Sequence, residues 1–149
     1  MLRIRPATLG DVYFMSSRLR GDDVRELETA MQMSARRTLY HSFAQSRLCF
    51  VGSPERDPVV MFGVGPDPRN PHLGIIWMVG THDLAKSSRS IIRQTPEVLQ
   101  SFLVLYPEGL HVLSDSRNLL HQRWLNLIGF QVLDTQDVHG VPFLHVFYR

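Results

Sequence analysis

Two apolar runs separated by a helical pattern constrain the fold of this chain more than any other feature. Residues 75–79 (IIWMV) are continuously apolar, as a strand buried on both faces requires. Residues 83–106 then carry apolar side chains at alternating spacings of four and three, and residues 109–113 return to a strand pattern. Two strands joined in this way run parallel through a right-handed crossover. We therefore predict residues 75–79 as the central strand of a sheet, with residues 109–113 parallel to it.

The remaining segments predict helices early in the chain and antiparallel strands around the central unit. Thr8 is expected to cap the first helix, and Asp22 or Asp23 the second. The proline-rich segment 66–74 is expected to be a surface loop. Pro96 should either kink the long helix or begin a new one with Thr95 as its cap. The predicted strands are residues 2–6, 47–52, 59–65, 130–133 and 141–148. The predicted helices are residues 9–18, a helix with an apolar stripe after Gly21, residues 34–45 and residues 118–128.

Composition limits the classes of protein that this chain can represent. Its 149 residues, of which 44% are hydrophobic, suffice for one core, so we predict a single domain over residues 1–149. The net charge of +2 is below that of a dedicated nucleic-acid binder. No apolar run approaches the roughly 18 residues of a membrane helix, and we expect a cytosolic protein. The single cysteine, Cys49, is predicted to be a small buried hydrophobe in a reducing compartment.

The segment 114–130, SDSRNLLHQRWLNLIGF, carries the most specific motif. Asn118 follows a predicted strand, a helix comes next, and Gly129 and Phe130 stand eleven and twelve residues after Asn118. This arrangement resembles the closing motif of the GNAT acetyltransferase fold. The resemblance implies an α/β (α+β) protein with a mixed, mostly antiparallel sheet flanked by helices. In GNAT enzymes the donor is acetyl-CoA, and by this resemblance Asn118 is a candidate cofactor-binding residue.

The GNAT pattern also includes a glycine-rich turn after the fourth strand, which binds the pyrophosphate of CoA through backbone N–H groups. Here the corresponding segment reads THDLAKSSR, and no glycine occurs between Gly80 and Gly109. Lys86 and Arg89 near a helix N-terminus still attract an anion and are candidate cofactor-binding residues. Asp83 places a negative charge at the same position and is otherwise expected to cap the helix.

Acid and base groups are sparse at the positions that the resemblance implies. The family's thiolate acid is a Tyr seven residues after the Asn, and this position is Leu125 here. His121, one turn earlier, is a candidate substitute, with a solvated helix-surface histidine as the alternative. No Glu occurs on the central strand, which leaves His82 beyond its end as the candidate base. The histidines show no metal-ligand spacing, so no metal is predicted.

A run of charged residues in the first quarter of the chain has two interpretations. Solvated pairs of opposite charge explain it adequately. The alternative is a polar cluster that lines a cleft beside the central strand. The run consists of Arg18, Arg20, Asp22, Asp23, Arg25, Glu26 and Glu28.

Across nearly the whole chain, six segments resemble a group of short GNAT-like proteins of tailed phages, the internal virion protein A or internal core protein group of short-tailed phages. The segments are IRPATLGDV, LRGDDVREL, VVMFGV, IIWMVGTHDL, LYPEGL and SDSRNLLHQRWLNLIGF. The resemblance implies a protein of the host cytoplasm and then of the capsid interior, which acts in capsid assembly or genome ejection by binding other virion proteins.

Because the glycine turn is missing and Leu125 replaces a hydroxyl donor, we predict a non-catalytic protein that neither transfers acetyl groups nor gains stability from CoA. The alternative is an acetyl-CoA-dependent N-acyltransferase with an atypical cofactor loop, which would use His82 or His121. A further hypothesis is a nucleic-acid-associated protein. It would bind through Arg36, Arg37, Arg89 and Arg93, with an affinity that falls steeply with salt.

Overall fold

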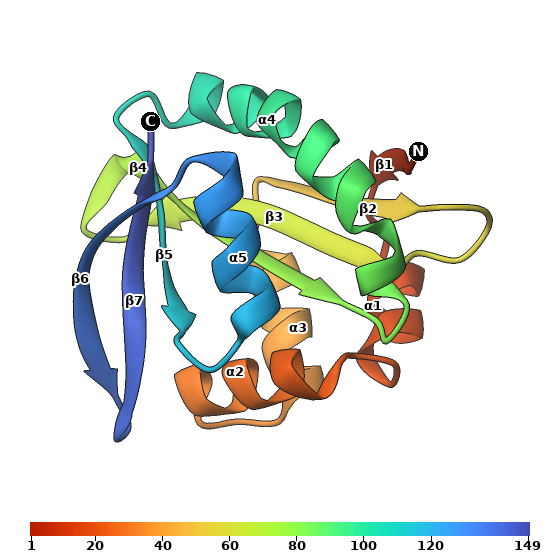
Figure 1. The fold of residues 1–149 in the computed structure, drawn as a ribbon, viewed down its shortest axis with the longest axis horizontal. Coiled ribbons are helices and arrows are strands. Elements are labelled where there is room, and N and C mark those ends of the chain that lie inside the picture. Colours follow the sequence, from red (N-terminus) through yellow and green to blue (C-terminus); the bar gives the residue numbers. More distant parts are fainter.

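The computed structural model describes all 149 residues, and a seven-stranded sheet with the order β1-β2-β3-β4-β5-β7-β6 forms its centre (Figure 1). β4 and β5 are parallel, and all other neighbouring strands are antiparallel. The predicted central strand and its parallel partner are therefore confirmed. The strands are β1 Arg3–Pro6, β2 Leu48–Ser53, β3 Val60–Asp67, β4 Asn70–Gly80, β5 Gly109–Asp115, β6 Gln131–Val138 and β7 Val141–Tyr148.

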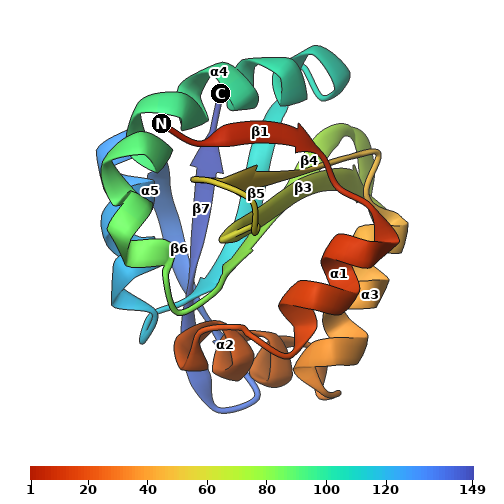
Figure 2. The same cartoon turned by 90° about the vertical axis from the view of Figure 1, so that its right-hand side faces the viewer.

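Helices cover both faces of this sheet. Met61 and Val79 pack with the N-terminal helices, whereas Val60 and Val64 face the two later helices, as alternation along a strand requires. Figure 2 shows these two groups of helices on opposite sides of the sheet. No helix combines the length and apolar character needed to cross a membrane. The helices are α1 Leu9–Ser16, α2 Gly21–Met31, α3 Ala35–Gln45, the short 3-10 helix η1 Leu84–Ser87, α4 Ser88–Leu105 and α5 Leu119–Ile128.

The first helix begins at a capping box, as predicted for Thr8. Asp11 N donates to Thr8 Oγ1 at 3.3 Å, and Thr8 N donates to Asp11 Oδ2 at 2.8 Å. Arg5 adds two hydrogen bonds of 2.7 Å to the Asp11 carboxylate and thereby lowers the pKa of Asp11. The end of β1 is thus tied to α1, which ends at Ser16 instead of residue 18.

Changing Thr8 to Ala is expected to lower the free energy of unfolding by about 1 kcal/mol, because the side-chain acceptor of the cap is lost. Urea denaturation measures this difference. Thr8→Ser retains the hydroxyl and should unfold close to the parent protein. Equal midpoints for all three proteins would show that the cap contributes nothing.

The proline-rich segment 66–74 is strand over most of its length, which corrects the predicted loop. Only Pro68 and Arg69 separate β3 from β4. The sheet accommodates these prolines because the pairing shifts its register between Pro66 and Asp67.

The last hairpin is also longer than predicted. β6 continues to Val138 because its turn consists of His139 and Gly140 alone, both with positive φ (51° and 84°). The part of β6 after Leu133 escaped prediction because it is polar and almost entirely exposed at the sheet edge.

The helix α4 runs without interruption through Pro96, so a new helix start at this residue is excluded. Thr95 caps nothing, since its Oγ1 donates to Ile91 O at 2.6 Å. Ile91, Leu99 and Phe102 are buried against the sheet and hold both halves of the helix in place. Their packing outweighs the hydrogen bond that the proline removes.

Candidate active site

The parallel strands β4 and β5 pair at one end only. Beyond Ile75 they separate, although β4 continues to Gly80 and β5 to Asp115 (Figures 1 and 2). The predicted direction of pairing is confirmed, but Ile75 is the only residue of the predicted strand 75–79 that pairs with β5. The paired residues are Leu73 with Gly109, Gly74 with Leu110 and Ile75 with His111.

The separated part of β4 leaves backbone groups facing this gap. Alternate residues of a strand direct their N–H and C=O groups to the same neighbour. His72 O accepts a hydrogen bond at 3.2 Å from Glu108 N, just before β5. Gly80 N donates to Asp23 Oδ2 at 2.7 Å. Ile76 and Met78 lie between these two positions at even spacing. Their N–H and C=O groups therefore point into the gap, where β5 no longer runs alongside.

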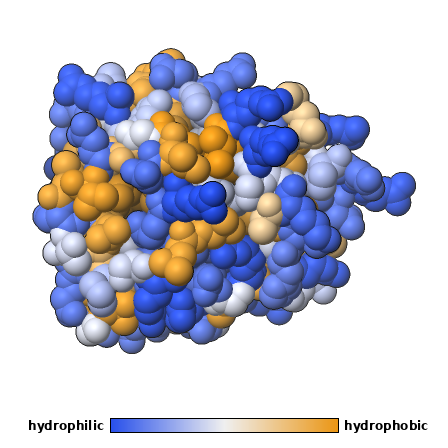
Figure 3. Space-filling model, in the orientation of Figure 1, coloured by the Kyte–Doolittle hydropathy of each residue, from blue (hydrophilic) through white to orange (hydrophobic).

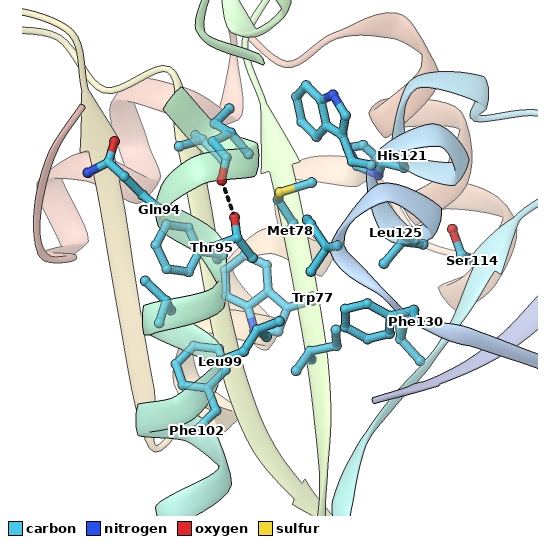
Figure 4. Close-up of a pocket in the computed structure, with 18 of the residues that line it drawn as sticks. Trp77, Met78, Gln94, Thr95, Leu99, Phe102, Ser114, His121, Leu125 and Phe130 are labelled. Atoms are coloured by element: carbon cyan, nitrogen blue, oxygen red, sulfur yellow. Dashed lines mark hydrogen bonds between the residues drawn. The ribbon is translucent and has the colours of Figure 1, made fainter. Parts of the chain in front are cut away.

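A cavity of about 130 Å³ lies beside the gap, and 17 of its 22 lining residues are hydrophobic. Glu26 reaches it from α2, and Leu125 of α5 lies in its wall. Figure 4 shows side chains of β5, of α5 and of Phe130, which follows α5, on one side of the cavity and α4 side chains on the other. The labelled residues are Ser114, His121, Leu125 and Phe130 on the first side, Gln94, Thr95, Leu99 and Phe102 on the second, and Trp77 and Met78 of β4 between them.

Asp23 ties α2 to the ends of β4 and α5 at the polar end of this cavity. Its Oδ2 accepts from Gly80 N, and its Oδ1 accepts from Arg20 Nη1 at 3.0 Å and from Asn118 Nδ2 at 2.9 Å. The predicted capping role is wrong for both aspartates, because Arg20 is the N-cap of α2 and makes no side-chain cap bond. Asp23 is turned inward instead, where it satisfies three buried or half-buried donors.

Glu26 is held next to Asp23 by one of its carboxylate oxygens. Oε1 accepts from Asp115 N at 3.1 Å and from Asn118 Nδ2 at 3.3 Å, whereas Oε2 makes no hydrogen bond with the protein. Burial and the charge of Asp23 raise the pKa of Glu26 to about 8, against the lowering effect of these two hydrogen bonds. A carboxyl group that titrates near neutral pH at the wall of a cavity is suited to accept a proton from a substrate.

His121 is buried, which corrects the expectation of a solvated helix-surface side chain. Its Nδ1 lies 3.2 Å from Asn118 Nδ2, whose two protons also face Asp23 Oδ1 and Glu26 Oε1. Nε2 is 3.3 Å from Asp23 Oδ1. Burial lowers the pKa of His121 and keeps the ring neutral. His121 lines the cavity as a neutral support of the Asp23 and Asn118 side chains.

His82, the predicted base, lies elsewhere. It is exposed and lines a separate polar hollow with Arg18, Asp57 and Asp83, which shares no residue with the apolar cavity. The structure therefore does not bring His82 to Glu26.

The turn after β4 is closed where a glycine-rich loop would be open. Leu84 N donates to Thr81 O at 3.0 Å and Lys86 N to Asp83 O at 3.2 Å, so these N–H groups are used within the turn. A Cβ at Gly80 would clash with the buried side chain of Leu84. Asp83 makes no cap bond, contrary to prediction, and its side chain pairs with Lys86 at 3.2 Å.

Lys86 of η1 and Arg89 in the first turn of α4 are exposed, and Arg89 makes no ion pair. These two side chains, and not an amide cradle, are the groups that this end of the site offers to a phosphate. Asn118 is completely buried and does not line the cavity; it positions Asp23 and Glu26.

The remaining candidate residues lie apart from this site. Arg36 and Arg37 belong to α3, whereas Arg89 and Arg93 belong to α4 on the opposite face of the sheet, so they form no single basic surface (Figure 2). Burial raises the pKa of the half-buried Cys49 to about 12, which keeps it a thiol. No group of three or more His, Cys, Asp and Glu side chains is placed to hold a metal ion.

The charged run of the N-terminal region divides between its two interpretations, because only Glu26 of its residues lines the cavity. Asp23 and Glu26, three residues apart on one face of α2, both reach the end of the gap. Arg25 and Asp22 form an exposed pair at 3.1 Å, as the first interpretation expects. The role of Glu26 itself was missed, although its spacing from Asp23 was visible in the sequence.

No protein-family model matches the chain, and no curated protein matches it in sequence. Solved structures match over nearly its whole length. An acetyltransferase of the GNAT family from Streptococcus pneumoniae has a TM-score of 0.65 at 13% identity and covers 99% of this chain and 98% of its own. AAC(6')-Ib in complex with ribostamycin and coenzyme A has a TM-score of 0.69 at 13% identity, with 98% and 92% covered. The chain has the GNAT acetyltransferase fold.

A third GNAT-fold neighbour is a chimera of spermidine N-acetyltransferase SpeG from Vibrio cholerae and hSSAT. Its TM-score is 0.67 at 12% identity, and the match covers 98% of this chain and 93% of the chimera. The fold that the motif of Asn118, Gly129 and Phe130 predicted is thereby confirmed.

The predicted non-catalytic role in capsid assembly or genome ejection is contradicted by these neighbours, which are named as acetyltransferases and in AAC(6')-Ib hold coenzyme A. The prediction rested on the missing glycine turn and on Leu125. It took no account of the open edge of β4, the apolar cavity and the Glu26 carboxyl group, which lie in segments that a motif search does not compare.

Proposed function

We propose that the protein is an acyl-CoA-dependent N-acyltransferase. The observation that carries the proposal is the position of Glu26, whose pKa is about 8, in the wall of an apolar cavity beside the unpaired edge of β4. Amide formation from a thioester can use a positioned base, and a free strand edge and an apolar cavity can hold the thioester donor. The GNAT fold of acetyltransferases supports the same conclusion.

The residues present fit an acyl-CoA donor, which supplies an activated acyl thioester. Ile76 and Met78 would hold its pantetheine arm, because an extended chain with amide groups can pair with a free strand edge as a further strand does. Lys86 and Arg89 would hold the diphosphate through their charges. The closed turn after Gly80 predicts weaker phosphate binding than a loop of free amides would give.

Glu26 would act as the general base. Its Oε1 is occupied by Asp115 N and Asn118 Nδ2, which leaves Oε2 to accept the proton of the attacking amine. Ser114 Oγ lines the cavity and accepts from Gln122 Nε2 at 2.8 Å, so its own hydroxyl proton remains available. In place of the tyrosine that Leu125 replaces, Ser114 would donate a hydrogen bond to the leaving sulfur.

Acetyl-CoA is expected to stabilise the protein against heat. A ligand at about 100 times its dissociation constant adds about 2.7 kcal/mol, which raises the Tm of a domain of this size by about 5 to 10 °C. Differential scanning fluorimetry with millimolar acetyl-CoA measures the shift. This expectation reverses the one drawn from the sequence. Absence of any shift at saturating acetyl-CoA would contradict the proposal.

A double variant, Lys86→Ala with Arg89→Ala, separates the contribution of the diphosphate in the same assay. It should lose most of the shift, whereas Arg56→Ala, a change at an exposed arginine between β2 and β3, should retain it. Equal shifts in both variants would show that the diphosphate binds elsewhere.

We propose a tailed-phage origin on the resemblance of the sequence alone. The host cytoplasm and capsid interior as locations, and other virion proteins as partners, stay predictions of that resemblance. A packaged protein would bind other virion proteins through its surface. On the face that carries α4 and α5, apolar side chains are interrupted by polar ones (Figure 3). Mass spectrometry of purified virions would find the chain if it is packaged, and its consistent absence would contradict the predicted location.

A further inference from the structure

We propose that the apolar cavity binds a donor acyl chain longer than acetyl, of about four to eight carbons. The inference rests on the proposed function and names the donor class of the same site. The structural basis is the division of the cavity into a polar end at Glu26 and an apolar remainder.

Polar side chains that line the cavity away from Glu26 are already paired within the protein. Thr95 Oγ1 donates to Ile91 O at 2.6 Å, a bond drawn in Figure 4. Trp77 Nε1 donates to Ser46 Oγ at 2.8 Å. Both polar atoms of the Gln94 amide are paired with the backbone of Leu2. Its Oε1 accepts from Leu2 N, and its Nε2 donates to Leu2 O, each at 3.0 Å.

A ligand group in this part of the cavity therefore finds no free side-chain partner for a hydrogen bond. An amide or a hydroxyl buried there would lose its bonds to water without replacement, whereas methylene groups lose nothing. The wall consists of aliphatic and aromatic side chains, including Leu99, Phe102 and Phe130. Leu125 stands where the resemblance implies a tyrosine, and its side chain adds a further apolar group to the wall on the α5 side.

The size of the cavity excludes acetyl as its full occupant. An apolar cavity of about 150 Å³ holds a benzene molecule, which has six carbons. The present cavity of about 130 Å³ is of that order and is much larger than a single methyl group. Each buried methylene improves binding about fourfold. A medium-length acyl chain thus uses the cavity that acetyl would leave mostly empty.

The test is a series of straight-chain donors with the wild-type protein. Acetyl-, butanoyl-, hexanoyl- and octanoyl-CoA are each offered with a panel of primary amines, and kcat/KM and the thermal shift are measured. We expect kcat/KM to rise about tenfold or more from acetyl to hexanoyl. An optimum at acetyl, with transfer intact, would overturn this inference and leave the proposed function standing. No binding and no transfer with any donor would overturn both.

Variants with a narrower cavity test whether the acyl chain of the donor binds there. Val98→Phe on α4 and Val112→Phe on β5 each enlarge a lining residue, and either should lower kcat/KM for octanoyl-CoA at least about tenfold more than for acetyl-CoA. Val104→Phe, at an exposed position of α4, is the matched control and should leave the ratio unchanged. Folding of each variant is checked by circular dichroism. An unchanged ratio in both folded cavity variants would overturn the inference.

Discussion

Glutamine in place of Glu26 is expected to lower the rate of the proposed acyl transfer by about 10²- to 10⁴-fold, the usual contribution of a positioned base. The amide oxygen of glutamine can still accept from Asp115 N, so the local structure is retained while the proton acceptor is lost. Steady-state release of free thiol from acyl-CoA, measured at pH 8.5 or above, gives the effect, since the pKa of Glu26 is about 8 and the wild-type carboxyl group is then mostly ionised.

Glu97→Gln is the matched control, because Glu97 is exposed on α4 and does not line the cavity. Its rate should equal that of the parent. Donor affinity should be similar in all three proteins, because Glu26 acts on the amine. A Glu26→Gln protein with the parental rate would rule out Glu26 as the base.

Trp124→Ala is expected to lower the free energy of unfolding by about 3 to 5 kcal/mol. Trp124 is 2% exposed and packs with Leu2, Val60, Leu84 and Ile91 between α5 and the sheet. Its removal leaves a large void in this cluster, and the loss is a major part of the stability of a typical domain. Chemical denaturation measures the change.

Leu127→Ala on the same helix is the control for Trp124. Leu127 is 56% exposed, so its truncation should cost less than about 1 kcal/mol. Both substitutions introduce alanine, the best helix former, so similar losses for both variants would show that the burial of Trp124 does not account for its contribution.

The sheet could be predicted because side-chain burial leaves a periodic pattern in the sequence. The apolar run that ends at Val79 indicated a central strand, and β4 is the fourth of seven. The same pattern gives no information on where backbone pairing stops, since Ile76 and Met78 are equally apolar whether β5 lies beside them or not. The gap, on which the site depends, was therefore outside the reach of the sequence pattern.

The site itself depends on contacts between distant segments. Glu26 accepts from Asp115 N across 89 positions of sequence, and Asp23 meets Asn118 across 95. A local pattern cannot show that α2 supplies the acceptors that allow polar residues of α5 to be buried. His121 was accordingly expected in solvent, although Asp23 and Asn118 provide for its burial.

The central claim, acyl transfer with Glu26 as base, is tested most directly by the pH dependence of amine-dependent thiol release from acyl-CoA. Glu26 with a pKa of about 8 is protonated below that pH and cannot accept a proton. The account predicts that kcat/KM rises tenfold per pH unit below 8, with an inflection near 8 that Glu26→Gln lacks. Thiol release that is absent at every pH, or a wild-type profile without this inflection, would contradict the account.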